Sequence, residues 1–70
     1  MELYQERVKE ELAELNEKLE KLKNFLESDK IEKVEKDERL RLMRQFRAMG
    51  NYALILMERI EAFKETKNRD

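Results

Sequence analysis

The sequence contains no cysteine, histidine or proline, and it has a single glycine. Without cysteine no disulfide can crosslink the chain, and without cysteine or histidine the usual ligands of zinc are missing. Without proline almost nothing opposes helix formation. A chain of 70 residues usually needs a crosslink, a metal or a partner chain to be stable. We therefore expect this protein to assemble with copies of itself.

Long hydrophobic runs and an excess of one charge are also missing. The longest apolar run covers residues 52–57, whereas a membrane-spanning helix needs about 20 apolar residues. The first six residues include two glutamates and are not those of a signal peptide. The 16 basic and 17 acidic residues nearly cancel, which disfavours a general nucleic-acid binder. We expect no membrane partner, no nucleic-acid partner and a cytoplasmic location.

The residues that catalysis needs are scarce. Apart from the two tyrosines, Ser28 and Thr66 are the only hydroxyl candidates for a nucleophile, and no imidazole is present to activate them. The many glutamates fall where a solvated helix face is expected, so convergent carboxylates for a metal are not indicated. The sequence predicts a protein that is not an enzyme and holds no cofactor and no metal.

Apolar residues in the first half recur with the alternating four- and three-residue spacing of a heptad repeat. They are Val8, Leu12, Leu15, Leu19, Leu22 and Leu26. This pattern predicts a helix over about residues 2–27 with one apolar stripe facing a partner helix. Asp29 and Glu32 have the spacing of a capping box, and Asp37 is a candidate N-cap. We therefore expect a short helical linker over residues 28–37, whose Ile31 and Val34 cover Phe25 and Leu26, and a second helix over about 38–66.

The second helix carries more apolar residues than one partner helix can cover. One stripe holds Leu42, Met49, Leu56 and Phe63; a second holds Met43, Phe46, Ala53, Met57 and Ile60; Leu54 and Ile55 add to both. Such a helix must be buried on most sides. The expected fold is therefore all-α, an antiparallel two-helix hairpin in a single domain of residues 1–70, assembling into a homo-oligomeric helical bundle. One long coiled coil is the alternative, but the charged segment 28–37 breaks the heptad register.

Charge is distributed unevenly within the balanced total. Residues 39–57 contain no acidic residue, and their only cations are arginines: Arg39, Arg41, Arg44 and Arg47. Arginine presents a planar fork that suits phosphate and carboxylate groups. A structural role is the alternative, in which Arg44 and Arg47 pair with Glu17 and Glu20 of the first helix or across an oligomer interface.

Polar residues also interrupt one possible seam of the second helix, which runs through Leu42, Gln45, Met49, Tyr52, Leu56 and Arg59. Buried polar groups must be satisfied, so these residues either form an internal network or line a cavity for a polar ligand. Gly50 lies beside them, where a mid-helix glycine costs about 1 kcal/mol and indicates close approach of another helix or a ligand. The candidate ligand-binding residues are Arg41, Arg44, Gln45, Arg47, Asn51, Tyr52 and Arg59.

The segments ELAELNEKLEKLKNFLES and LMRQFRAMGNYALILMERI resemble a family of short uncharacterised bacteriophage proteins first catalogued in crAss-like phages. The matching positions in the second helix are Gln45, Met49, Tyr52, Leu56, Arg59 and Ile60. The resemblance implies a phage origin and a role in the cytoplasm of an infected bacterium. Several small helical phage proteins act as sponges that oligomerise and enclose cyclic nucleotide or cyclic ADP-ribose signals of bacterial immunity, and this chain is similar to them in size and expected architecture.

Two functions follow as expectations. In the first, the assembly sequesters a small phosphate-bearing host immune signal, with Tyr52 stacking on a base, arginines holding phosphates and Gln45 or Asn51 reading polar edges. In the second, the chain is an inhibitor or adaptor that docks a host or phage protein through the apolar face of the second helix. The third possibility is a purely structural phage component or a weak nucleic-acid binder, of which the near-zero net charge disfavours the second.

Overall fold

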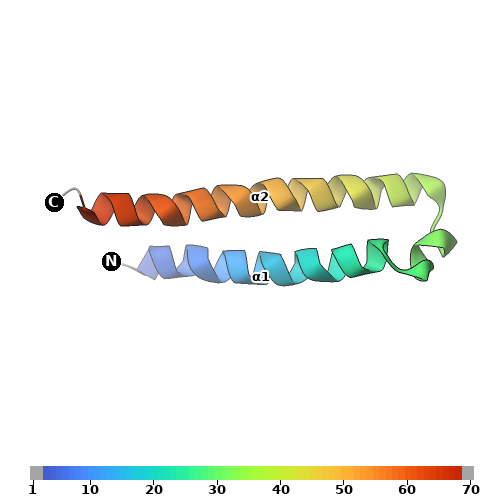
Figure 1. The fold of residues 1–70 in the computed structure, drawn as a ribbon, viewed down its shortest axis with the longest axis horizontal. Coiled ribbons are helices and arrows are strands. Elements are labelled where there is room, and N and C mark those ends of the chain that lie inside the picture. The colour runs from blue at the N-terminus through green and yellow to red at the C-terminus, as the bar shows by residue number, and fades with distance from the viewer. Residues whose placement is uncertain (1–2, 69–70) are drawn as a thin grey trace.

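The computed structural model describes residues 3–68, and side chains as far as residue 64. Helix α1 (Leu3–Leu26) and helix α2 (Lys36–Asn68) run antiparallel, joined by the short 3-10 helix η1 (Asp29–Lys33), as Figure 1 shows. The hairpin is slender, measuring 55 × 15 × 15 Å. Within the described residues there is no strand. The all-helical hairpin predicted from the heptad pattern is confirmed.

Ser28 shapes the end of α1. Its hydroxyl donates to the carbonyl of Phe25 at 2.8 Å and accepts from the backbone N–H of Lys30 at 3.2 Å. The Ser28 side chain thereby ends α1 and caps η1. The capping role predicted for Asp29 is wrong, because Ser28 already occupies the N-cap position and Asp29 is the first residue of η1.

The start of α2 also differs from the prediction. The backbone N–H of Arg39 donates to the carbonyl of Glu35 at 2.9 Å, so Glu35 is the N-cap residue. Asp37, predicted to be that cap, lies in the first turn of α2. A carboxylate there still interacts favourably with the exposed N–H groups of the helix N-terminus.

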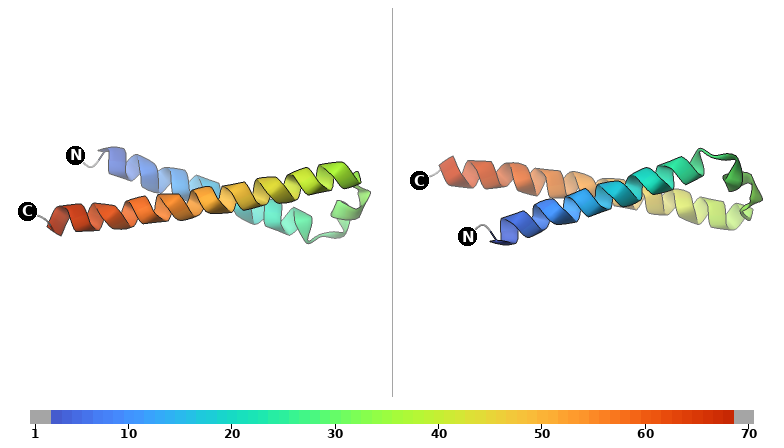
Figure 2. Two further views of the ribbon diagram at one scale, coloured as in Figure 1. Left: turned by 90° about the horizontal axis from the view of Figure 1, so that it is seen from above. Right: turned by 90° about the horizontal axis from the view of Figure 1, so that it is seen from below.

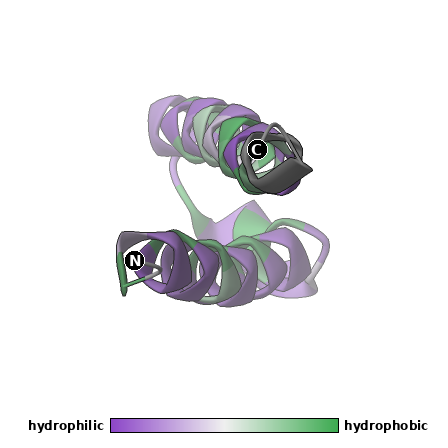
Figure 3. Ribbon diagram, turned by 90° about the vertical axis from the view of Figure 1, so that its left-hand side faces the viewer, coloured by the Kyte–Doolittle hydropathy of each residue, from purple (hydrophilic) through white to green (hydrophobic). Residues whose placement is uncertain are grey.

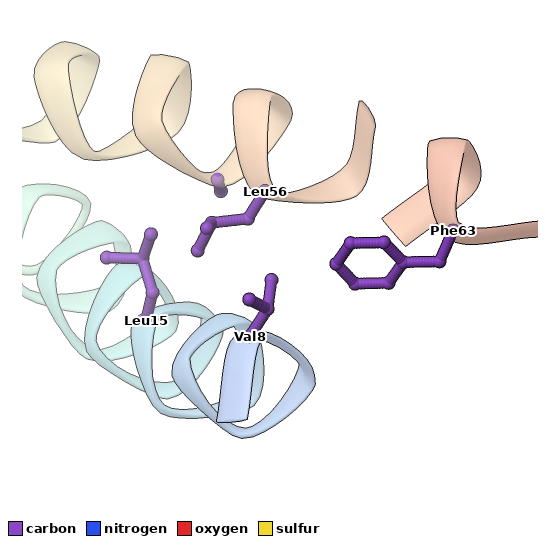
Figure 4. Packing of buried hydrophobic residues seen from close by; sticks show 5 residues of the cluster. Val8, Leu15, Leu56 and Phe63 are labelled. Carbon is purple, nitrogen blue, oxygen red and sulfur yellow. The ribbon is translucent and has the colours of Figure 1, made fainter. Parts of the chain in front are cut away.

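The core lies between the two helices, toward the chain termini. Five apolar side chains are buried there: Val8, Leu15, Ala53, Leu56 and Phe63. Figure 4 shows Leu56 of α2 directed toward Leu15 and Val8 of α1, and Leu56 is the one with no exposed surface (0%). Val8, Leu12, Leu15 and Leu19 all pack in this cluster, which confirms the predicted stripe of α1.

The seam of α2 corrects the prediction. It runs through Leu42, Phe46, Met49, Ala53, Leu56, Ile60 and Phe63, all of which are buried or half-buried. The polar seam positions Gln45, Tyr52 and Arg59 are instead exposed, and no polar side chain is buried in the part of the chain described. Each polar residue has an apolar neighbour one position later, and burying that neighbour avoids desolvating the polar group. The core therefore contains no polar network.

The apolar surplus of α2 stays on the surface of the hairpin. Leu40, Met43, Leu54, Ile55 and Met57 are about half exposed, between 45% and 54%. Viewed from the end at which the chain termini lie, hydrophobic segments alternate with hydrophilic ones along both helices (Figure 3). One partner helix does not cover α2, as the sequence indicated.

The helices cross rather than lie parallel along their whole length. Figure 2 shows them crossing near the middle of the hairpin and diverging on both sides of the crossing, toward the chain termini and toward the connector. The seam residues nearest the connector, Leu26, Leu42 and Phe46, are accordingly only half-buried. This divergence leaves room for a pocket at that end of the molecule.

Candidate functional site

A pocket of about 250 Å³ lies where the helices diverge at the connector end. It is lined by Leu26 of α1, Ile31 of η1, and Arg39, Met43, Phe46 and Arg47 of α2. Its wall is therefore mostly apolar, with two guanidinium groups. Apolar walls combined with a few polar groups are typical of small-molecule sites.

The helical repeat explains why these α2 residues share the pocket. Residues three, four or seven positions apart project from one side of a helix. Met43, Phe46 and Arg47 follow Arg39 by four, seven and eight positions, so all four line one side of α2. Ile31, predicted to cover Leu26 at the end of the hairpin, lies with Leu26 in the pocket wall. The connector thus supplies part of the pocket.

Arg39 has an unusual environment. The residue is half-buried, and its Nε atom is inaccessible to solvent yet has no hydrogen-bond acceptor among the described residues. A buried donor without a partner costs about 1–3 kcal/mol. A phosphate or carboxylate oxygen in the pocket would reach Nε only after the guanidinium group turned, and the hydrogen bond formed would then remove that cost. Arg39 is therefore the side chain of the pocket best suited to an anionic ligand.

The charge around the pocket is positive. None of its lining residues is acidic, and the acid-free stretch 39–57 supplies four of the six. The backbone positions of Arg39 and Arg47 lie about two helical turns apart, about 12 Å along the axis at 1.5 Å per residue. They would hold separate anionic groups, or the two ends of one extended ligand.

The seven residues predicted to bind ligand are not brought together. From Arg41 to Arg59 they extend along about 27 Å of α2 at 1.5 Å per residue, and all seven are exposed. Only Arg47 lines the pocket. Gln45, Tyr52 and Arg59 are spaced by seven and share a flank of α2 away from Arg47. A single small ligand on one chain cannot contact the whole set.

Several of these side chains have local interactions. The Nε of Arg41 donates to a carboxylate oxygen of Glu38 at 2.8 Å, one turn earlier on α2. The amide nitrogen of Gln45 contacts the Sδ of Met49 at 3.8 Å. The charge of Arg41 is thus partly neutralised by Glu38, and the Gln45 side chain contacts a residue of its own helix.

The structure also tests the purely structural interpretation of the arginines. Over the described side chains, the ion pairs join residues of the same helix, Glu38 with Arg41 and Glu61 with Lys64. Arg44 and Arg47 form no pair with Glu17 or Glu20. Pairing of these arginines within the hairpin is therefore not observed, and both remain available to a ligand or to another chain.

Sequence reasoning did not include Arg39 among the candidate residues, although a signal for its place in the pocket wall was present. Arg39, Leu42 and Phe46 are spaced by three and four, which places Arg39 on the seam of α2 itself. An arginine on an apolar seam, at the end next to the connector, lies where a cavity forms when the helices diverge. The seam was assigned to other residues, so this position was not recognised.

Other kinds of site receive less support. A second pocket of about 70 Å³ lies near the chain termini, between Gln5, Lys9, Ile60, Phe63 and Lys64; it is too small for a nucleotide. Among the described residues no group of three acidic side chains is placed to hold a metal ion. No helix in the described part of the chain has the length and apolarity to cross a bilayer.

The family model described as Sequestin matches residues 2–62, which include α1, the connector and most of α2. The chain belongs to the Sequestin family. The family name describes sequestration of a ligand, which is a binding role rather than a catalytic one. The matched segment of this Sequestin includes every residue that lines the larger pocket. No curated protein and no solved structure matches the chain.

Proposed function

We propose that this Sequestin is a non-enzymatic phage protein that oligomerises and sequesters a small phosphate-bearing host immune signal. The signal would be of the cyclic nucleotide or cyclic ADP-ribose type, and its removal in the cytoplasm of the infected bacterium would counter antiphage defence. The observation that carries the proposal is the pocket in which Arg39, with its unpartnered Nε, and Arg47 flank apolar walls.

The chemistry of the pocket fits a ligand of this class. A nucleotide combines a flat, weakly polar ring with charged phosphate, and the pocket combines Phe46 and Met43 with two guanidinium groups. Arginine binds phosphate through parallel N–H donors, while an aromatic ring offers a face for stacking. The ring would lie against Phe46, and the phosphate would accept hydrogen bonds from Arg39.

The size of the pocket supports capture by an assembly rather than by one chain. Pockets that enclose drug-sized ligands have volumes of about 300–1,000 Å³, whereas this pocket holds about 250 Å³. One hairpin would therefore surround only part of a cyclic dinucleotide. A further copy would cover the remainder, and the exposed apolar residues of α2 give that copy a surface to contact.

Isothermal titration calorimetry with a panel of cyclic mononucleotides, cyclic dinucleotides and cyclic ADP-ribose isomers tests the proposal. We expect one ligand class to bind, with affinity reduced at least tenfold in Arg39→Gln and Arg47→Gln, since each removes a charge-assisted hydrogen bond worth about 1.5–3 kcal/mol. Arg59→Gln is the matched control on the same helix, outside the pocket. Lack of binding across the panel would contradict the proposal.

The exposed apolar face of α2 favours a second candidate, an inhibitor or adaptor that docks a host or phage protein. Amphipathic helices commonly bind grooves through such faces. This function requires the face to be free in the purified protein. A partner recovered from infected cells with the wild type, but not with Leu54→Glu, would support it, and a purified protein already assembled through that face would contradict it.

A further inference from the structure

The exposed apolar residues of α2 form a second heptad seam. Leu40, Met43, Arg47, Gly50, Leu54 and Met57 follow one another at intervals of three, four, three, four and three. This second seam is offset by one position from the seam that packs on α1. Its four large apolar side chains are 45–54% exposed. A sustained heptad seam is the pattern by which helices pair along their length, and α1 does not occupy this one.

Gly50 lies in the middle of the second seam and is not required by the hairpin. A Cβ atom built on Gly50 would have no neighbour within 4 Å, and its backbone dihedral φ is not positive. Neither crowding nor backbone conformation within the chain explains a glycine in this helix. A glycine on an exposed seam does allow the backbone of another helix to approach closely.

Charge selects the orientation of such a pairing. The half of α2 before Gly50 carries arginines and no acidic residue from 39 onward, whereas the half after it carries both signs: Glu58 and Arg59, then Glu61, which pairs with Lys64 of the same helix. Parallel pairing would set the arginine-rich halves against each other. Antiparallel pairing sets each arginine-rich half against the half with the glutamates, so the surface is complementary to itself under a twofold axis.

We propose that two copies of this Sequestin pair antiparallel through the second seams of their α2 helices, crossing near Gly50 and Asn51. Arg44 and Glu58 each lie seven positions from Asn51, so Arg44 of each copy is level with Glu58 of the other. Met43 and Met57 each lie seven positions from Gly50, so with the crossing between Gly50 and Asn51 both pairs are level to within one residue, about 1.5 Å along the helix. The two charged residues border the seam, where opposite charges commonly fix partner orientation in paired helices.

This pairing refines the roles of the arginines and rests on the oligomerisation in the proposed function. Arg44 serves assembly, whereas Arg39 and Arg47 serve the ligand. Met43 and Arg47 belong both to the second seam and to the pocket wall, so the helix of the second copy covers an open side of the pocket. Each pocket is completed only in the pair. A host protein as occupant would not account for the self-complementary charges.

Charge reversal tests the pairing, measured as the dissociation constant of self-association by analytical ultracentrifugation without ligand. Arg44→Glu and Glu58→Arg each turn two attractive pairs into two repulsive ones, and we expect each to weaken association about tenfold. The double variant restores both pairs and should return to within about twofold of wild type. Arg44 and Glu58 lie about 21 Å apart on one helix at 1.5 Å per residue, so no contact within a chain can produce that rescue.

Arg59→Glu, on another flank of α2, is the control and should leave association unchanged. Orientation is tested by mixing Arg44→Cys and Glu58→Cys chains under oxidation, because the natural chain has no cysteine. Antiparallel pairing yields the mixed disulfide between the two variants. A monomeric wild type, single reversals without effect, or disulfides only between identical variants would each overturn the pairing. Because no ligand is present, these results stand apart from the calorimetric test of sequestration.

Discussion

Replacing Gly50 with alanine should stabilise the isolated hairpin while weakening its self-association. In the hairpin the added methyl group meets nothing within 4 Å, so the substitution adds no clash. It removes the entropic cost of a glycine in a helix, which is about 1 kcal/mol relative to alanine. For a domain of this size that gain corresponds to a rise in Tm of roughly 4–8 °C.

Self-association should change in the opposite direction. If the second seam pairs with its copy near Gly50, two methyl groups enter the closest approach of two helices, and overpacking of this kind costs about 1–3 kcal/mol. The dissociation constant should then rise about five- to 150-fold, since 1.4 kcal/mol is a factor of ten. Gly50→Ala should therefore raise the stability of the single chain while lowering its affinity for a second copy, so the two effects can be distinguished.

Thermal unfolding followed by circular dichroism over a wide range of protein concentration measures both quantities. At the lowest concentrations Gly50→Ala should have the higher Tm; as concentration rises, the Tm of wild type should increase more steeply, because association stabilises the folded state. Ala48→Gly is the matched control: Ala48 is exposed and lies outside the second seam, so it should lower stability by about 1 kcal/mol without changing the concentration dependence. A Gly50→Ala chain that is less stable when monomeric would refute this reasoning.

Two further substitutions test the hairpin itself. Leu56→Ala should lower the free energy of unfolding, measured by urea denaturation, by about 2–5 kcal/mol, because Leu56 is fully buried. Ile55→Ala is the control and should cost far less, because Ile55 is half exposed. Equal losses in the two variants would mean that the core lies elsewhere. Ser28→Ala should cost about 1 kcal/mol, because it removes both hydrogen bonds of that hydroxyl, while Asp29→Ala, which leaves the cap in place, should have a smaller effect.

The sequence was most informative about α1, in which a single apolar stripe is clearly marked. The heptad stripe of α1 has apolar residues at every seam position, and between Val8 and Leu22 the other positions are polar, charged or alanine, so its inward face could be read directly. On α2 apolar residues occupy two adjacent heptad seams, and periodicity alone allowed either Gln45 or Phe46 to face α1. The structure places Phe46 inward, because burial of an aromatic ring is favourable and burial of an unpaired amide is not.

The candidate site was predicted only in part. The acid-free arginine stretch directed attention to the first half of α2, and of the candidate residues Arg47 lines the pocket. Arg39 was left out of the candidate set, and Tyr52 and Arg59 were included although they lie on another flank. Proximity along a helix does not place side chains on the same face, and the pocket also needs Leu26 and Ile31 from two other elements.

The sequence by itself determined that this chain is helical, that it turns near Ser28, and that α2 carries more apolar surface than α1 can cover. These follow from local preferences and from composition, which do not depend on how the helices meet. Only the tertiary structure decided which of two adjacent seams faces α1, which seam remains open, and where a pocket forms. The physical reason is that crossing helices pack closely over a limited length, so the angle between α1 and α2 determines which side chains are buried and which surround a cavity.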